Sequence, residues 1–317
     1  MSDNLGNKKG AKSAYIRSDE VEAYLESTAK GDFRALAKLL TWVERSGPAK
    51  ALAHKQLVAP TAFTFRAGIT GPPGAGKSTL IGEIIQQLRK QGLKVGVLAV
   101  DPSSPFSKGA ILGDRIRYSE HFNDDGVFIR SVGTRGSLGG LSAASYLMLR
   151  AFDCAQFDIV LIETVGVGQT ELEIINVADF VSVVLVPESG DSIQAMKAGL
   201  TEIADLFVVN KSDRPGAEGL KNELRATLEL GENRKPVQIV STIATEKNGI
   251  DEFCQAILKA KKDFDKKSRT TPERLRAEAK ALFRWLIEDQ IETEIETVKD
   301  LPSFVQKITS FSDKISK

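Results

Sequence analysis

The stretch GPPGAGKS, residues 71–78, constrains the fold of this chain more than any other stretch. It follows the apolar run FTFRAGIT and precedes apolar residues at helical spacing, so it predicts a loop between a buried strand and a helix. Its spacing fits G-x-x-x-x-G-K-[ST], a phosphate-binding loop in which glycines let successive N–H groups turn toward phosphate oxygens. A strand that runs into such a loop is typical of an open α/β sheet.

This loop predicts both a phosphate site and part of a metal site. We expect Lys77 to reach the β- and γ-phosphates and Ser78 to offer its hydroxyl to Mg²⁺, a hard cation that prefers oxygen ligands. The amino end of the following helix adds partial positive charge. The alternative, a Gly-Pro turn before an amphipathic helix, is disfavoured by the strand and helix on either side. The residues predicted to surround the phosphates are Gly71, Pro72, Pro73, Gly74, Ala75, Gly76, Lys77, Ser78 and Thr79.

Composition limits the kind of protein that carries this loop. The 317 residues have a net charge of +1 and no apolar stretch long enough to span a bilayer, so we expect a soluble globular protein without nucleic acid or membrane as partner. Cys154 and Cys254 have no disulfide or metal spacing, and the amino-terminal stretch lacks an apolar signal core. The predicted location is the cytoplasm.

From Ala62 to about Ile257, apolar strands alternate with helical stretches. This order predicts an α/β P-loop NTPase fold with a mostly parallel sheet, helices on both faces, and helical extensions at both ends. The expected strands are FTFRAGIT, KVGVLAVD, VFIRS, FDIVLIET, FVSVVLVP, LFVVNKSD and PVQIVST. The expected helices cover 77–91, 141–154, 171–177, 192–203, 218–230 and 250–261.

Charged helical segments flank this domain, at about 19–56 and 272–316. Thr271 followed by Pro272 is a helix-start signal, and the Lys-rich stretch before it resembles a solvated linker. The carboxyl-terminal segment can therefore cap the sheet or form an interaction arm, and we favour the arm. The predicted boundaries are 1–61 for an amino-terminal extension, 62–265 for the nucleotide-binding domain and 266–317 for the carboxyl-terminal arm.

The stretch NKSD at the end of LFVVNKSD predicts which base is bound. In GTPases an N-K-x-D loop at this place reads guanine, since the carboxylate of Asp213 accepts from the ring N–H and the exocyclic amine, which adenine lacks. We expect Asn210 to bond the base and brace the loop and the stem of Lys211 to cover the ring. Further base-loop candidates, with a poor motif match, are Ser241, Thr242 and Ile243.

Strand-end acids are candidates for the metal and for hydrolysis. The strand IVLIE ends in Glu163 and continues TVGVGQ, where Gly166 takes the glycine position of a D-x-x-G element that senses the γ-phosphate. The alternative for Glu163 is a strand terminus with an exposed acid. Val167 stands where many GTPases have a glutamine, which predicts slow unassisted hydrolysis. The predicted catalytic set is Lys77, Asp101, Asp114, Glu163 and Gly166, with Ser78, Asp101, Asp114 and Glu163 as the metal site.

These motifs together resemble the methylmalonyl-CoA mutase-associated GTPases, a family also known as arginine/ornithine transport ATPase-like proteins. The matching stretches, in chain order, are GPPGAGKST, AVDPSSPF, GAILGDRIR, TRGSLGGLS, ETVGVGQTE, VPESGDSIQAMKAG and VVNKSD. The resemblance implies a SIMIBI-class P-loop domain, GTP or GDP with Mg²⁺, and a homodimer formed by a carboxyl-terminal helical arm. It further implies a chaperone of adenosylcobalamin-dependent acyl-CoA mutases, with the adenosyltransferase as a further candidate partner.

Carried over residue by residue, the resemblance gives Lys77 and Ser78 the phosphate and magnesium roles, and Asp101, Asp114 and Glu163 the metal-site acids. It places Asp191 and Lys197 in a mobile loop that communicates with the mutase. Two departures stand out. Lys108 replaces a glycine usual in the family, and DRIRYSE differs from the common RM ending.

Two other classes of function stay open at this point. A P-loop kinase of a small metabolite would need an acceptor pocket, and the guanine-reading loop argues against ATP as its donor. A nickel-type metallochaperone GTPase would need a ligand cluster, whereas His54 and His121 are the only histidines of the chain. We expect His121, in SEHFNDDG, to be a surface residue beside a turn. Which acyl-CoA mutase is served does not follow from the sequence.

Overall fold

The computed structural model describes residues 16–60, 62–101, 118–133, 141, 143–164, 172–187, 199–229, 236–296 and 298–315, with only the backbone for Asp101, Leu301 and 311–315. Its centre is a sheet in which the strand order is β3-β2-β4-β1-β5-β6-β7 and every pair is parallel. The seven strands are β1 (Arg66–Thr70), β2 (Val95–Asp101), β3 (Val127–Gly133), β4 (Ile159–Thr164), β5 (Phe180–Leu185), β6 (Leu206–Asn210) and β7 (Gln238–Thr242). The predicted α/β fold with a parallel sheet is confirmed.

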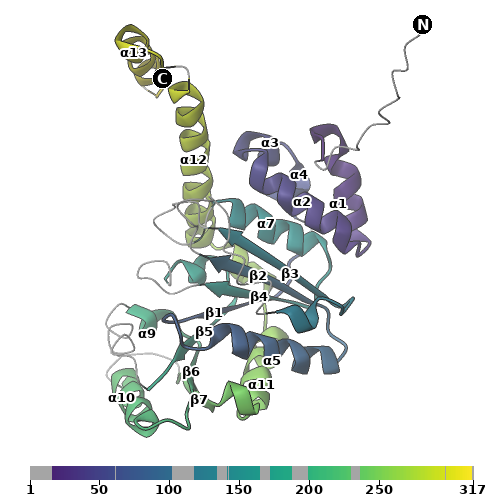
Figure 1. The fold of residues 1–317 in the computed structure, drawn as a ribbon, viewed down its shortest axis with the longest axis vertical. Helices are drawn as coiled ribbons and strands as arrows, with labels where there is room; N and C mark the ends of the chain where they lie inside the picture. Colours follow the sequence, from purple (N-terminus) through teal and green to yellow (C-terminus); the bar gives the residue numbers. More distant parts are fainter. Residues whose placement is uncertain are drawn as a thin grey trace, which may run out of the picture.

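Helices cover both faces of this sheet (Figure 1). One face carries α5 (Lys77–Lys90) and α11 (Ile250–Lys262). The other carries α7 (Ala143–Cys154), α10 (Ala217–Glu229) and the 3₁₀ turn η4 (Glu173–Asn176). Shorter elements are η1 (Ser18–Glu20), η2 (Ser119–His121), α9 (Thr201–Ile203), η6 (Ala244–Glu246) and η7 (Lys266–Thr270).

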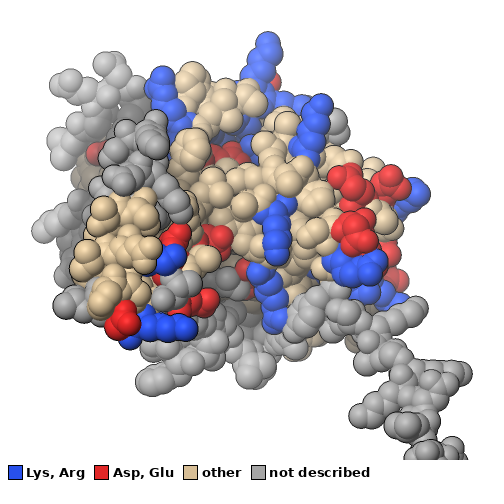
Figure 2. Space-filling model, turned by 90° about the horizontal axis from the view of Figure 1, so that it is seen from above, with Lys and Arg blue, Asp and Glu red and all other residues tan. Residues whose placement is uncertain are grey.

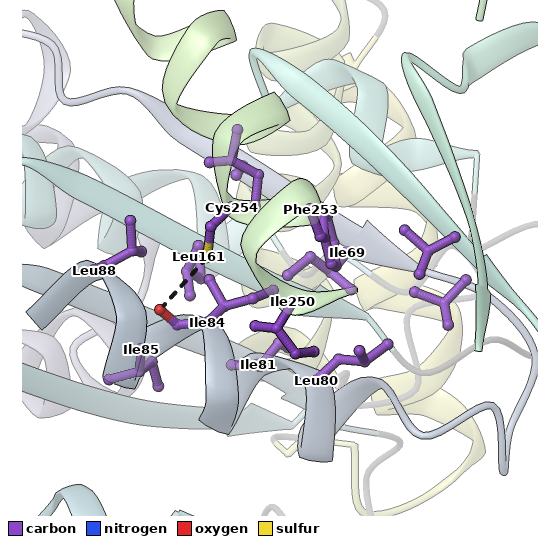
Figure 3. Close-up of a cluster of buried hydrophobic side chains, with 14 of the residues drawn as sticks. Ile69, Leu80, Ile81, Ile84, Ile85, Leu88, Leu161, Ile250, Phe253 and Cys254 are labelled. Atoms are coloured by element: carbon purple, nitrogen blue, oxygen red, sulfur yellow. Dashed lines mark hydrogen bonds between the residues drawn. The ribbon is translucent and has the colours of Figure 1, made fainter. Parts of the chain in front are cut away.

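Alternation along the strands explains why both faces need covering. In β1, Ile69 packs in the cluster formed with α5 and α11, which Figure 3 shows around Ile81, Ile84 and Phe253. Gly68, between two residues of that face, points to the opposite side, where an added Cβ would lie 2.6 Å from Ile174 Cδ1 of η4. Side chains on both faces of a parallel strand are buried in this way, so the strands read as continuous apolar runs.

Four helices form the amino-terminal extension: α1 (Val21–Ala29), α2 (Phe33–Arg45), α3 (Pro48–Leu52) and α4 (Lys55–Val58). Asp32 caps α2 by accepting hydrogen bonds from the N–H groups of Arg34 and Ala35. The buried face of α2 packs in one cluster with α7. On its other side, Glu44 pairs with Arg130 of β3 at 2.6 Å. The extension is therefore a second layer outside α7.

The carboxyl-terminal segment forms α12 (Pro272–Ile295) and α13 (Leu301–Ile315), and α12 runs away from the sheet with α13 at its outer end (Figure 1). The predicted start is confirmed, since the Thr271 hydroxyl accepts from the Arg274 N–H. Leu282 and Trp285 pack against the cluster of α7, whereas Phe283 is 64% exposed. One side of α12 thus caps the domain and the other faces solvent.

A buried charge network fixes the base of α12 to the sheet. Arg66, at the start of β1, pairs with Asp153 at 2.6 Å, and Arg269 bonds Asp179 Oδ1 at 2.8 Å. Arg274 also bonds Asp179 and donates to the carbonyl of Ala178. Burial lowers the pKa of Arg66 to about 10, so its guanidinium stays charged at neutral pH. The network lies at the amino end of β1, away from the phosphate-binding loop at its carboxyl end.

One helix prediction needs correction. The stretch 171–177 was expected to be an α-helix, but its described part holds the 3₁₀ turn Glu173–Asn176, which leads directly into Ala178 and β5. The stretch 192–203, also expected to be a helix, lies mostly outside the described residues, and its described end contains the short helix α9.

Charges on the surface are mixed. On the face seen in Figure 2, basic and acidic side chains both occur and are interspersed with uncharged residues. Among the described residues, no helix combines the length and the apolar composition that crossing a membrane requires.

Candidate functional site

The predicted phosphate-binding loop joins β1 to α5 at the carboxyl edge of the sheet. Gly71 has φ +138°, and a Cβ there would lie 2.1 Å from the Val184 carbonyl oxygen, so no side chain fits. Gly76 has φ +85° and lies against Asn210, whose Nδ2 would be 2.5 Å from an added Cβ. Both glycines of the motif are therefore required by the close approach of neighbouring strands.

Lys77 follows this loop as the first residue of α5 and is 6% exposed. Its Nζ donates to the carbonyl oxygens of Gly71 and Pro72 at 2.7 and 2.9 Å. The ammonium group thus lies against the loop backbone, where phosphate oxygens of a nucleotide can reach it. Of the other loop residues, Pro73, Gly74 and Thr79 are exposed and Ala75 is buried.

Glu163, near the end of β4, meets the first turn of α5. Its Oε1 accepts from the Ser78 hydroxyl at 2.6 Å and its Oε2 from the Tyr118 hydroxyl at 2.6 Å. Glu163 is only 3% exposed, so the alternative of an exposed acid at a strand end is wrong. Sequence reasoning missed Tyr118. The signal available was the departure from the family pattern at DRIRYSE, the stretch that contains Tyr118.

The chemistry of Ser78 and Glu163 fits Mg²⁺. Mg²⁺ takes one or two protein oxygens, phosphate oxygens and several waters, so a hydroxyl and a carboxylate beside the phosphate loop suffice. No group of three potential His, Cys, Asp or Glu ligands occurs in the part of the chain that the structure describes. Asp101 ends β2, which pairs with β4, so its backbone is at the same edge of the sheet.

The NKSD loop lies beside the phosphate loop. Asn210 is 2% exposed and its Nδ2 donates to the Ala75 carbonyl at 2.8 Å. Its Oδ1 accepts from the Thr242 hydroxyl at 3.0 Å and from the Ala244 N–H at 3.3 Å. Asn210 therefore connects the phosphate loop to the loop after β7. These contacts engage Oδ1 and one N–H of Nδ2, and the contact of Asn210 with the base stays a prediction.

Lys211 and Asp213, predicted to contact the base, lie in the loop that follows β6. Lys211 has φ +55°, and its Nζ donates to the Gly74 carbonyl at 2.9 Å, so its stem spans from one loop to the other. Asp213 is exposed. The loop after β7 lies next to them, since the Ser212 N–H donates to the Thr242 carbonyl at 3.1 Å. Ser241 and Ile243 flank that residue and are half-buried.

Several predicted residues lie outside the described part of the chain. These are Asp114, Gly166, Asp191 and Lys197. His121 is described, and its predicted surface position is wrong. It is 6% exposed, its Nε2 has no hydrogen-bond partner, and it lies near Gly82 of α5.

Comparison with known proteins identifies the family of the chain. The family described as "Methylmalonyl Co-A mutase-associated GTPase MeaB" matches residues 36–300. The chain belongs to the MeaB family. Its match includes the phosphate loop, Glu163 and the NKSD loop, so the recognition made from sequence motifs is confirmed.

Relatives and a solved structure extend this assignment. A protein of Pyrococcus horikoshii whose name describes a GTPase is 42% identical over 294 residues, which are 90% of this chain and 92% of that one. GTPase ArgK of Escherichia coli is 38% identical over 243 residues, 72% of each chain. The crystal structure of a LAO/AO transport system kinase has a TM-score of 0.64 and 27% identity, covering 88% of this chain and 85% of that one. This MeaB-family chain is a P-loop GTPase that binds guanine nucleotides.

Proposed function

We propose that this MeaB-family protein is a Mg²⁺-dependent GTPase that assists an adenosylcobalamin-dependent acyl-CoA mutase, methylmalonyl-CoA mutase or a relative. Its GTP cycle gates delivery of the cofactor and protects or reactivates the mutase. The observation that carries the proposal is the Ser78–Glu163 pair beside the phosphate loop, in a chain whose family is described as mutase-associated.

Residues of this chain account for binding of the nucleotide and the metal. Lys77 holds the terminal phosphates, Asp213 accepts from guanine, and Ser78 with Glu163 holds the metal, with Asp101 and Asp114 as further acids. Ser78 and Glu163 would hold Mg²⁺, which would supply positive charge against the negative charge that develops during phosphoryl transfer to water. The N–H of Gly166 is the proposed sensor of the γ-phosphate.

The chain's sequence also supports dependence on a partner. Val167 replaces the glutamine that orients water in many GTPases, and ordering of a site by a partner raises hydrolysis by about a thousandfold or more in known cases. We therefore propose that the mutase stimulates hydrolysis through the segment with Asp191 and Lys197. The adenosyltransferase is a further candidate partner, because it and the mutase, rather than this chain, would hold cobalamin.

A homodimer is part of the proposal. On α12, Phe283, Ile287, Ile291 and Ile295 recur every four residues and are 36–64% exposed. Such spacing places them along one side of a helix. An apolar stripe of this length on a helix that extends from the domain supports pairing with a second copy of the chain.

A kinase of a small metabolite is the second candidate, favoured by the similarity to the LAO/AO transport system kinase. It differs from the first in the acceptor of the phosphoryl group. A nickel-type metallochaperone has no comparable support, because the described residues offer no cluster of three ligands for a transported metal.

The deciding experiment measures phosphate release from GTP by the purified chain, alone and with each candidate acyl-CoA mutase. We expect turnover well below one per second alone and strong stimulation by one mutase. Lys197→Ala and Asp191→Ala should remove the stimulation and leave basal turnover and GDP affinity unchanged. Transfer of phosphate to a metabolite, with stimulation by no mutase, would instead establish the kinase.

A further inference from the structure

The metal-site carboxylate has a second partner that the activity described so far does not use. The Ser78 hydroxyl donates a hydrogen bond to Oε1 of Glu163, and the Tyr118 hydroxyl donates one to Oε2, each at 2.6 Å. Tyr118 comes immediately before η2 rather than from the phosphate loop or β4, and it lies 45 residues before Glu163 in the chain. We infer that Tyr118 is a positioning residue that holds the Glu163 carboxylate in the orientation required at the metal site.

The surroundings of Tyr118 make this contact a fixed one. The Tyr118 side chain is fully buried and packs in the cluster formed by α5, α11 and the sheet. Its carbonyl accepts from the His121 N–H at 3.0 Å, which closes the turn η2 around it. Close packing around the ring restricts its rotamers, so the position of the Tyr118 hydroxyl relative to Glu163 is fixed.

Fixing the carboxylate matters because a glutamate side chain has a broad terminal torsion. With both oxygens engaged by hydroxyl donors, the carboxylate plane is set and the Ser78 oxygen is held beside it. Without the Tyr118 hydroxyl, the carboxylate can turn about its terminal bond and presents Oε1 toward the metal less often. The fraction of molecules ready to hold Mg²⁺ falls accordingly.

Tyr118→Phe is the variant that isolates this contact, since it removes one oxygen and keeps the buried ring. Tyr146→Phe is the matched control, because Tyr146 is 6% exposed and lies in α7 on the opposite face of the sheet. The readout is the release rate of a fluorescent GDP analogue across a titration of free Mg²⁺, using the isolated chain. Binding of Mg²⁺ slows this release, so the midpoint reports metal affinity without hydrolysis or a mutase.

For Tyr118→Phe we expect the Mg²⁺ midpoint to rise by about tenfold, as expected for loss of a hydrogen bond to a charged group. Release without Mg²⁺ should equal that of the wild type, and Tyr146→Phe should match the wild type throughout. In a chain that already carries Glu163→Ala, adding Tyr118→Phe should change nothing further, because Tyr118 acts through Glu163.

The inference rests on the proposed metal role of Glu163, and the same titration separates the two. If Glu163→Ala loses the Mg²⁺ response while Tyr118→Phe keeps the wild-type midpoint, the role of Tyr118 is wrong and the metal site stands. Faster release by Tyr118→Phe at every Mg²⁺ concentration, zero included, also overturns it, since that result indicates general loosening. If Glu163→Ala retains the full Mg²⁺ response, the metal site itself is misassigned.

Discussion

Substitution of Asn210 by alanine tests whether this residue holds the site together or only contacts the base. Its amide bonds the Ala75 carbonyl, the Thr242 hydroxyl and the Ala244 N–H, and all three of those residues are buried. Asn210→Ala removes the partner of all three groups at once. A buried polar group left without a partner costs about 1 kcal/mol at the low end, so the free energy of unfolding should fall by about 3 kcal/mol.

For a chain of 317 residues, about 3 kcal/mol corresponds to a fall in melting temperature of about 4.5 °C. The assay is thermal unfolding of the nucleotide-free protein, followed by GDP titration below the transition. Asn222→Ala is the control, because Asn222 is exposed on α10 and bonds only its neighbour Arg225 among described residues. Its melting temperature should equal that of the wild type.

Asn210→Asp sharpens the test. The aspartate keeps an oxygen for Thr242 and Ala244 but places a second oxygen against the Ala75 carbonyl, which it repels. We expect a smaller loss of stability than with alanine and an equal or larger loss of GDP affinity, since the phosphate loop is the part released. If Asn210→Ala loses GDP affinity with a melting temperature within about 1 °C of the wild type, the bracing role is refuted.

Three further predictions concern the base, the acid and the thiols. In a binding titration, the wild type should prefer GDP over ADP by at least about a hundredfold. Asp213→Asn should weaken GDP binding and strengthen binding of xanthosine diphosphate. Equal affinity of the wild type for ADP and GDP would refute the guanine assignment. Glu163→Gln should reduce Mg²⁺-dependent hydrolysis by orders of magnitude with little change in melting temperature. Glu163→Ala should also lower the melting temperature, because it removes the acceptor of the buried Tyr118 hydroxyl. A Glu163→Gln variant with wild-type hydrolysis would contradict this prediction. Burial raises the pKa of Cys154 to about 11 and of Cys254 to about 12, so both thiols stay protonated up to about pH 10. Both should therefore react slowly with a disulfide reagent at pH 8 until denaturant is added. Rapid reaction of the folded chain would contradict the burial of the two thiols.

The fold was predictable because its signals are local. The seven apolar runs are short, two-sided strands, and Gly71 to Ser78 fixes which strand starts the nucleotide site. The same holds for Thr271 as a helix start. The 3₁₀ turn at Glu173–Asn176 was not predicted, since a local pattern does not contain the close approach of Ile174 to Gly68 of β1.

The details of the site depend on contacts between residues far apart in the chain, which a local pattern does not contain. Glu163 stands near a strand end, where an acid is usually exposed, yet it is buried and bonded to Tyr118 and Ser78. His121 sits in a turn-like sequence, yet η2 packs it against α5. Arg66 lies in a stretch predicted as an apolar strand, although its charge is balanced by Asp153 from α7.

We propose above that the GTP cycle of this chain serves an adenosylcobalamin-dependent acyl-CoA mutase. The most direct measurement is binding of the chain to purified mutases by analytical ultracentrifugation, with GDP and then with a non-hydrolysable GTP analogue. We expect a complex with one mutase whose dissociation constant differs between the two nucleotides, and loss of that difference in Lys197→Ala. No complex with any acyl-CoA mutase in either nucleotide state would contradict it.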